Sequence, residues 1–361
     1  MKVTKHKFPY EWTLKDANFT KDKGTVFSCF ACGGGSTMGY KLAGFNVLGC
    51  NEIDPKMIEA YKLNHNPKYA YLEPIQTFKL RKDLPKELYQ LDILDGSPPC
   101  SSFSMAGNRE KDWGKEKKFR EGQADQILDT LFFDFIDLAK ELQPKVVVAE
   151  NVSGMMMGTA KEYVKKVYTA FKEAGYQLRI EPYLLDASTM GVPQRRRRVF
   201  FIAIRNDLAP KFMEQIDMFQ EAPRLELNFN EKPILYKEIE DKADTIKTIE
   251  GDYIDLWEKT VPGNSSSKYH EKGFYFGAYK ISLNEVCPTI IGKFRPKSGC
   301  GVYHYNIPRI LNKNEYCKIG TFPLDYNFTH KDYGYLIGMS VPPVMVAQIA
   351  SRIYEQWINK L

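Results

Sequence analysis

Long apolar runs, a secretion signal and clustered metal ligands are all missing from this chain of 361 residues. No apolar run approaches the roughly 20 residues that span a bilayer, and the first twenty residues contain no apolar signal core. We therefore expect neither a membrane protein nor a secreted one. The histidines are few and scattered, at His6, His65, His270, His304 and His330. They supply no second ligand pair for Cys29-x-x-Cys32, so no metal site is expected.

Regularly spaced cysteines are missing too, because the seven cysteines are odd in number and irregular in spacing. This argues against a disulfide framework and for reduced thiols in a cytosol-like compartment. Internal repeats and low-complexity tracts are also absent. The composition, 43% apolar and 27% charged, is that of an ordinary globular protein. The length suits one large core with a smaller lobe.

The formal charge of +6 is a modest bias toward polyanions, and its distribution is more informative than its size. Basic residues concentrate in Arg109–Arg120 and in the run Arg195–Arg198. Either cluster alone is typical of a solvated surface. Because both clusters flank candidate chemistry, nucleic acid becomes a candidate partner, although composition alone leaves the question open.

Strand-like and helix-like stretches alternate through the first two hundred residues, which predicts a doubly wound α/β sheet. Strands are expected at Thr25–Ala31, Asn46–Ile53, Leu91–Asp95, Val146–Ala149, Gln177–Leu185 and Arg198–Ile204. Helices are expected at Thr37–Ala43, Pro55–Leu63, Gln126–Leu142 and Lys161–Ala174. The run Val146–Ala149 is apolar at every position, as in a strand that is covered on both faces.

The pattern becomes weaker after about residue 206, where Tyr, Lys, Asn and Pro predominate, and this indicates a second, irregular domain. Near the C-terminus, apolar residues at spacings of three and four predict a helix that packs on the α/β domain; they are Val346, Ile349, Ile353 and Trp357. We therefore expect a large α/β domain of residues 1–206 plus 335–361 and a small domain of residues 207–334.

A glycine-rich turn, Phe30–Gly39, follows the first expected strand and opens a helix. Its glycines allow a tight turn and close approach of a ligand to free helix N–H groups. The spacing Gly-x-Gly-x-x-x-Gly differs from that of dinucleotide binders. Glu52, at the end of the next strand, is placed to accept the hydroxyls of a ribose. A nucleoside cofactor is favoured over a plain strand-to-helix turn.

Cys100 follows Gly96-Ser97-Pro98-Pro99 at the end of a strand, where doubly wound sheets gather their chemistry. Two prolines force an extended path and present the thiol in a fixed direction, so a nucleophile is favoured over a core cysteine. Glu150 ends the next buried strand and is either a helix cap or a proton donor in a partly desolvated site.

The basic run leads into another strand, so its side chains should alternate between two sides. Arg196 and Arg198 share one side and Arg195 and Arg197 share the other. We expect that one pair faces a site and the other faces phosphates.

Together these segments resemble the cytosine-C5 DNA methyltransferase family over nearly the whole chain and in the family's order. The matching motifs are Phe30–Gly39, Glu52-Ile53, Pro98-Pro99-Cys100, Glu150-Asn151-Val152, Gln194-Arg195-Arg196-x-Arg198, Arg309-Ile310-Leu311 with Glu315 and Phe322-Pro323-Leu324-Asp325, and Gly338–Pro343. Three positions depart from the family pattern. Cys32 replaces the first glycine of the loop, Pro74 replaces an Asp at the adenine, and Met339 replaces an Asn near the methionine part of the cofactor; these changes bear on cofactor affinity.

The resemblance implies S-adenosylmethionine as cofactor, S-adenosylhomocysteine as product, and a covalent bond between Cys100 and cytosine carbon 6. It assigns Glu150 to the ring's N3 and Arg198 to O2, with Arg196 in support. The implied cofactor contacts are Phe30, Ala31, Cys32, Gly33, Gly35, Glu52, Ile53, Ile75, Pro99, Leu131 and Ser340. The implied DNA contacts are Ser101, Ser104, Arg109, Arg195 and Arg197.

The resemblance also implies that the substrate is a cytosine flipped out of double-stranded DNA and that the small domain recognises the target sequence. We further expect a monomer that is cytoplasmic and associated with the nucleoid. The motifs say nothing about a cognate restriction endonuclease. Three alternatives are considered: a related enzyme acting on transfer RNA, a non-catalytic DNA-binding module and a nicotinamide oxidoreductase. Against the enzyme acting on transfer RNA, the small domain lacks the Cys-Phe-Thr of that branch. Against a non-catalytic module, Cys100, Glu150 and Arg198 are all present. Against an oxidoreductase, the glycine spacing differs from that of dinucleotide binders.

Overall fold

The computed structural model describes residues 5–99, 116–117, 126–127, 130–157, 160–217, 220–241, 248–270, 278–292, 301–329 and 333–361. The chain forms two compact units. One, the sheet unit, comprises Phe19–Leu185, Arg197–Asn228 and Ala347–Leu361. The other, the loop-rich unit, comprises Met1–Asn18, Asp186–Arg196 and Phe229–Val346. Residues 207–228 thus fold with the sheet, whereas the functional division into catalytic and recognition domains stays a prediction.

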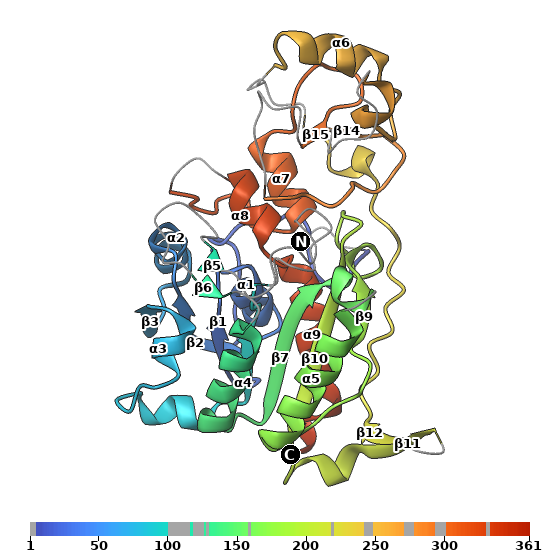
Figure 1. Ribbon diagram of the computed structural model, residues 1–361. Coiled ribbons are helices and arrows are strands. Elements are labelled where there is room, and N and C mark those ends of the chain that lie inside the picture. Colours follow the sequence, from blue (N-terminus) through green and yellow to red (C-terminus); the bar gives the residue numbers. More distant parts are fainter. Residues whose placement is uncertain are drawn as a thin grey trace. The chain divides into compact units, whose positions relative to one another are not determined.

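One sheet organises the sheet unit, with strand order β3-β2-β1-β4-β7-β10-β8 and β9 beside β10 (Figure 1). The strands are β1 (Thr25–Cys29), β2 (Asn46–Glu52), β3 (Tyr69–Leu72), β4 (Ile93–Gly96), β7 (Val146–Val152), β8 (Tyr176–Gln177), β9 (Tyr183–Asp186) and β10 (Arg197–Arg205). Neighbours from β3 to β7 are parallel. The chain reverses its direction of growth between β1 and β4, so this pair is the topological switch point. The expected doubly wound α/β fold is confirmed.

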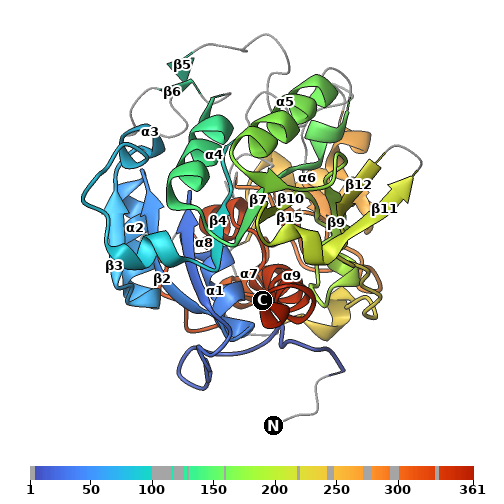
Figure 2. The same cartoon turned by 90° about the horizontal axis from the view of Figure 1, so that it is seen from below.

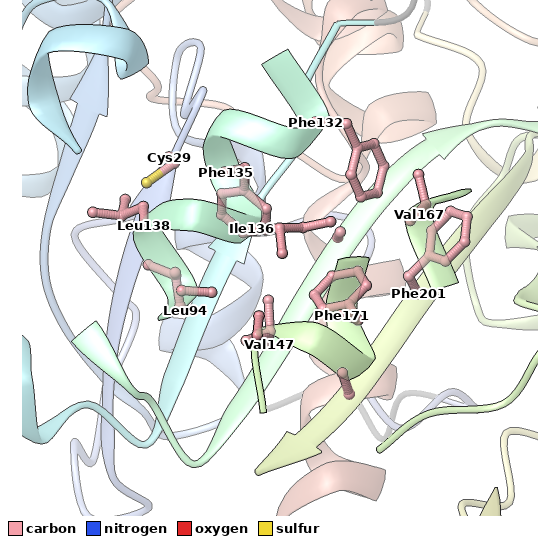
Figure 3. Packing of buried hydrophobic residues seen from close by; sticks show 14 of the residues in the cluster. Cys29, Leu94, Phe132, Phe135, Ile136, Leu138, Val147, Val167, Phe171 and Phe201 are labelled. Carbon is pink, nitrogen blue, oxygen red and sulfur yellow. The ribbon is translucent and has the colours of Figure 1, made fainter. Parts of the chain in front are cut away.

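Helices cover both faces of this sheet. Figure 2 shows α4 (Leu131–Leu142) and α5 (Ala160–Glu173) on one face and α1 (Gly35–Leu42) with the end of α9 (Pro343–Gln356) on the other. Between the sheet and α4 and α5 lies the main core, where apolar chains of β4, β7 and β10 pack together (Figure 3). The remaining helical elements are α2 (Pro55–His65), α3 (Ile75–Phe78), η1 (Lys86–Gln90), η2 (Ser153–Met156), η4 (Ala209–Phe212) and η7 (Ile358–Lys360).

Several expected elements differ from the structure. In place of the single strand expected at Gln177–Leu185 there are two short strands, β8 and β9, with irregular chain between them. The strand β10 runs antiparallel to β7. The helix expected from Gln126 begins at Leu131, because Gln126–Ile127 forms β6, paired with β5 (Glu116–Lys117). The strand β3 was not expected. The strands β11 (Met213–Asp217) and β12 (Gln220–Pro223), which were not expected either, pair antiparallel.

The C-terminal apolar stripe is buried as predicted: Val346, Ile349, Ile353 and Trp357 are each no more than 4% exposed. Within the sheet unit, Trp357 donates from its indole N–H to the Arg224 carbonyl at 2.7 Å, and Tyr354 meets Phe45 edge-on. The stretch Tyr333–Lys360 is long and apolar enough to cross a membrane by length and composition, although no apolar run of that length was expected. Its apolar window is 89% buried within the protein, as in a core helix.

The loop-rich unit has little regular structure and a small core of its own around Ile249, Ala278, Tyr303 and Ile310. Its elements are η3 (Ala187–Thr189), η5 (Tyr236–Glu238), α6 (Asp252–Lys259), β13 (Asn264–Ser265), η6 (Ser266–Tyr269), β14 (Tyr279–Lys280), β15 (Val302–Tyr303), α7 (Lys313–Gly320) and α8 (Tyr333–Met339). Polar contacts supplement this small core. The buried Glu315 carboxylate accepts hydrogen bonds from both terminal guanidinium nitrogens of Arg309, at 2.7 and 2.9 Å, and from the Tyr236 hydroxyl at 2.6 Å.

Replacing Glu315→Gln should destabilise the loop-rich unit strongly. The substitution leaves the buried Arg309 guanidinium without its countercharge, and breaking such a pair costs about 3–5 kcal/mol. Thermal or denaturant unfolding measures the change. Glu162→Gln is the matched control, since Glu162 pairs with Lys165 at 2.9 Å in an exposed position, where such pairs contribute about 1 kcal/mol or less. Equal losses for the two variants would contradict the expectation.

Candidate active site

Polar side chains form a row along one face of the sheet, near the carboxyl ends of its parallel strands. Ser28 pairs with Asp95 across β1 and β4, and Asp95 pairs with Val148 of β7. Because side chains alternate along a strand, Glu150 lies on the same face as Val148. Arg198 is opposite Val152 on β10 and shares this face as well. The Tyr40 hydroxyl of α1 contacts Asp95, which shows that this is the face that α1 covers.

Glu150 and Arg198 form an ion pair, with 2.9 Å between Arg198 Nε and Glu150 Oε1. Their side chains are only 11% and 15% exposed, so the pair is poorly screened by water. Burial lowers the pKa of Arg198, while the adjacent Glu150 raises it. The structure therefore brings together two of the predicted catalytic residues, one carboxylate and one guanidinium, at the end of β7.

Asn151, between Glu150 and Val152, fixes the segment that leads to the predicted nucleophile. Its buried amide donates from Nδ2 to the Pro98 carbonyl at 3.1 Å, and its Oδ1 accepts the Val152 N–H at 2.9 Å. The two bonds tie the Pro98-Pro99 segment to the end of β7. Cys100 and the predicted DNA contacts Ser101, Ser104 and Arg109 lie outside the described residues.

Glu52 contacts the glycine turn directly, at Cys32. Glu52 is 7% exposed, and its carboxylate accepts backbone N–H groups from Cys32 at 2.6 Å, Ile53 at 2.8 Å and Asp54 at 2.9 Å. Burial raises the pKa of Glu52, and these N–H bonds lower it. Ile53 and Asp54 both donate to Oε1, so Oε2, which accepts only from Cys32 among these, retains a lone pair for a ligand hydroxyl. Glu52 thus anchors the turn and closes one side of it.

Gly34 shows why this turn needs glycine. Its φ is +92°, and a Cβ at this position would lie 2.1 Å from Nε2 of His65, at the end of α2. Phe30 and Cys32 also adopt positive φ, at 52° and 49°. The backbone is therefore held in a conformation that residues other than glycine rarely adopt, immediately before the first turn of α1.

The other predicted cofactor residues have varied environments. Ala31, Gly33 and Gly35 are buried in the turn, and Phe30, Ile53 and Pro99 are half-buried. Ile75 and Leu131 are 2% and 1% exposed and pack in the main core. Ser340 belongs to the loop-rich unit, where its hydroxyl donates to the Leu336 carbonyl at 2.8 Å. Their contact with a cofactor stays a prediction.

The four arginines alternate in exposure as predicted: Arg195 and Arg197 are exposed, while Arg196 is buried and Arg198 half-buried. Arg196 is 1% exposed, and its guanidinium donates to the carbonyls of Ile290 at 2.9 Å and Gly338 at 3.0 Å. It therefore joins two segments of the loop-rich unit. This contact gives Arg196 a structural role, and its support of catalysis stays a prediction.

Asp95 is the functional candidate that the motif reasoning missed. It is 3% exposed and accepts the Ser28 hydroxyl at 2.7 Å and the Tyr40 hydroxyl at 3.2 Å. The available signal was a carboxylate inside the otherwise apolar stretch Ile93-Leu94-Asp95, since an acid in a buried strand requires partners.

The family model of C-5 cytosine-specific DNA methylases matches residues 24–355. Type II methyltransferase M.FnuDI of Fusobacterium nucleatum is 30% identical, over 93% of this chain and 95% of its own length. Type II methyltransferase M.Eco47II of Escherichia coli is 30% identical over 84% and 72%. The crystal structure of S. pombe Dnmt2 has the same fold, with a TM-score of 0.59 at 17% identity over 91% and 98%. The chain therefore belongs to the C-5 cytosine-specific DNA methylases and is a DNA cytosine-C5 methyltransferase.

Proposed function

We propose that Cys100, Glu150 and Arg198 carry out methyl transfer to a cytosine flipped out of duplex DNA. The Cys100 thiolate adds to carbon 6 of cytosine, which makes carbon 5 able to attack a methyl group. Negative charge then develops on N3 and O2 of the ring. Glu150 donates a proton or hydrogen bond at N3, and Arg198 contacts O2. Loss of the carbon-5 proton to water or a nearby base expels the thiolate.

The residues around the glycine turn fit S-adenosylmethionine, whose use the family implies. Glu52 offers a buried acceptor oxygen, Oε2, for a ribose hydroxyl, and the turn that it holds leads directly into α1. We assign the contacts to Phe30, Ala31, Cys32, Gly33, Gly35, Glu52, Ile53, Ile75, Pro99, Leu131 and Ser340. When bound, the cofactor supplies an electrophilic methyl group on a sulfonium. The protein's residues hold it and exclude water from the reacting atoms.

DNA is the substrate class of the family, and duplex recognition is our proposal for this chain. Residues 207–334 would read base edges, while Ser101, Ser104, Arg109, Arg195 and Arg197 contact the target strand and its phosphates. The exposure of Arg195 and Arg197 supports this assignment. Base flipping is required because carbon 6 is inaccessible in a stacked duplex. We propose a monomer that acts in the cytoplasm, on the nucleoid.

The Glu150–Arg198 ion pair, at the strand end that also holds Pro98, is the observation that carries this proposal. The test is transfer of labelled methyl from S-adenosylmethionine to unmethylated genomic DNA, followed by sequencing for 5-methylcytosine. We expect methylation of one cytosine within one short motif. Bulk transfer RNA is the matched control substrate, and transfer to RNA instead of DNA would contradict the proposal.

A further inference from the structure

Asp95 occupies a distinctive place in the sheet unit. It lies on β4 at the topological switch point, paired with Ser28 of β1, and ligands of doubly wound sheets bind outside this point. Its carboxylate bonds to Ser28 and Tyr40, and Ser36 in the first turn of α1 is a third partner. Asp95 thus connects the strand that leads to Cys100 with the helix that follows the glycine turn.

The Asp95 carboxyl gains or loses its proton near neutral pH. Burial raises the pKa of Asp95 to about 7, hydrogen bonds from Ser28, Tyr40 and Ser36 lower it, and the charge of Glu150 raises it. Two other titratable groups lie near it: Tyr40 of α1, which bonds to it, and Cys29 of β1, whose side chain packs in the main core on the other face of the sheet. Burial raises the pKa of both well above the usual range. Both remain neutral in the physiological range, so neither adds a charge that changes there.

We propose that Asp95 determines specificity for the cationic cofactor S-adenosylmethionine over its neutral product S-adenosylhomocysteine. The two molecules differ by one methyl group and one positive charge on sulfur. A carboxylate that is 3% exposed and bonded to the helix that follows the glycine turn attracts the cation and is poorly screened. Methyl transfer removes that positive charge, so the product loses the attraction and leaves more readily. This inference rests on the proposed use of S-adenosylmethionine.

Linkage gives the proposal a signature that does not require catalysis. A nearby cation favours the ionised carboxylate, so binding S-adenosylmethionine below pH 7 should release protons from Asp95, whereas S-adenosylhomocysteine should not. As the pH rises through 7, Asp95 becomes ionised in the free protein. The preference for S-adenosylmethionine over S-adenosylhomocysteine should then increase several-fold and level off.

Calorimetric titration of the full chain with each compound, between pH 6 and 8 in buffers of different ionisation enthalpy, tests this inference. In Asp95→Asn the preference should become independent of pH, and the extra proton release should disappear. Asp92→Asn is the matched control, because Asp92 ties the opposite end of β4 to the Thr25 N–H at 2.7 Å. It should leave both readouts unchanged. Melting curves at pH 8 check that Asp95→Asn is folded, which we expect because asparagine keeps the size of the side chain and an acceptor oxygen.

The outcomes separate the two proposals. If the chain binds neither compound, the proposed cofactor is wrong. If it binds both with a pH-independent ratio, or if Asp95→Asn keeps the wild-type pH dependence, the proposal for Asp95 is overturned while the proposed function stands.

Discussion

Replacing Cys100→Ser should abolish methylation of DNA while the protein still folds and binds its cofactor. A serine hydroxyl remains protonated at neutral pH and is a far weaker nucleophile than a thiolate, so carbon 6 is not attacked. Loss of a residue that forms the covalent bond lowers the rate by about 10³-fold or more. Transfer of labelled methyl to genomic DNA measures the change, and Cys317→Ser is a suitable control because Cys317 is buried in α7.

Trapping provides a second measurement on the same variant. Duplex DNA with 5-fluorocytosine at the target position has no removable proton on carbon 5, so the adduct cannot release the thiolate. We expect a covalent protein–DNA complex with the wild-type chain and none with Cys100→Ser. A complex that persists in the variant would assign the nucleophile elsewhere, and Cys32, in the glycine turn, would be the next thiol to test.

The sheet was predictable because its central strands are largely apolar and the helices α4 and α5 are amphipathic. Val146–Ala149 shows this clearly, since only a strand covered on both faces has such a run. The direction of each strand was not predictable. The strand β10 has the same local apolar pattern as its neighbours but runs antiparallel to β7, because strand direction depends on the path of the connecting chain and not on the local pattern. The edge strand β3 was missed, because its half-exposed residues give no such signal.

The site was predictable as motifs but not as contacts. Glu150 and Arg198 are 48 positions apart, and their pairing depends on the register of β7 against β10. Alternation predicted that Arg196 and Arg198 lie on one side and Arg195 and Arg197 on the other. It could not predict that the Arg196 guanidinium binds carbonyls 94 and 142 positions away, at Ile290 and Gly338. Likewise, nothing in the sequence around Asp95 specifies Tyr40 as its partner.

Replacing Glu150→Gln should lower the rate of methylation by about 10²–10³-fold, the usual loss when one donor to developing charge is removed. Glutamine keeps the size of the side chain but has no carboxyl proton to give to N3. It also leaves the Arg198 guanidinium, 2.9 Å away, without its carboxylate. Because the loss concerns the reacting ring, binding of S-adenosylmethionine should change little. Single-turnover methylation and calorimetry measure the two effects separately.

The competing explanation is that Glu150 only pairs with Arg198 and keeps the end of β7 folded. Removing one partner of a buried pair costs about 3–5 kcal/mol, so that explanation predicts a large fall in stability with activity lost through unfolding. The variant Arg198→Met breaks the same pair from the other side and supplies the matched comparison. If Glu150 donates at N3 and Arg198 acts at O2, both variants lose activity at temperatures where melting curves show them folded. Should Glu150→Gln methylate DNA at the wild-type rate, Glu150 would be a structural residue and the donor at N3 would have to be another group.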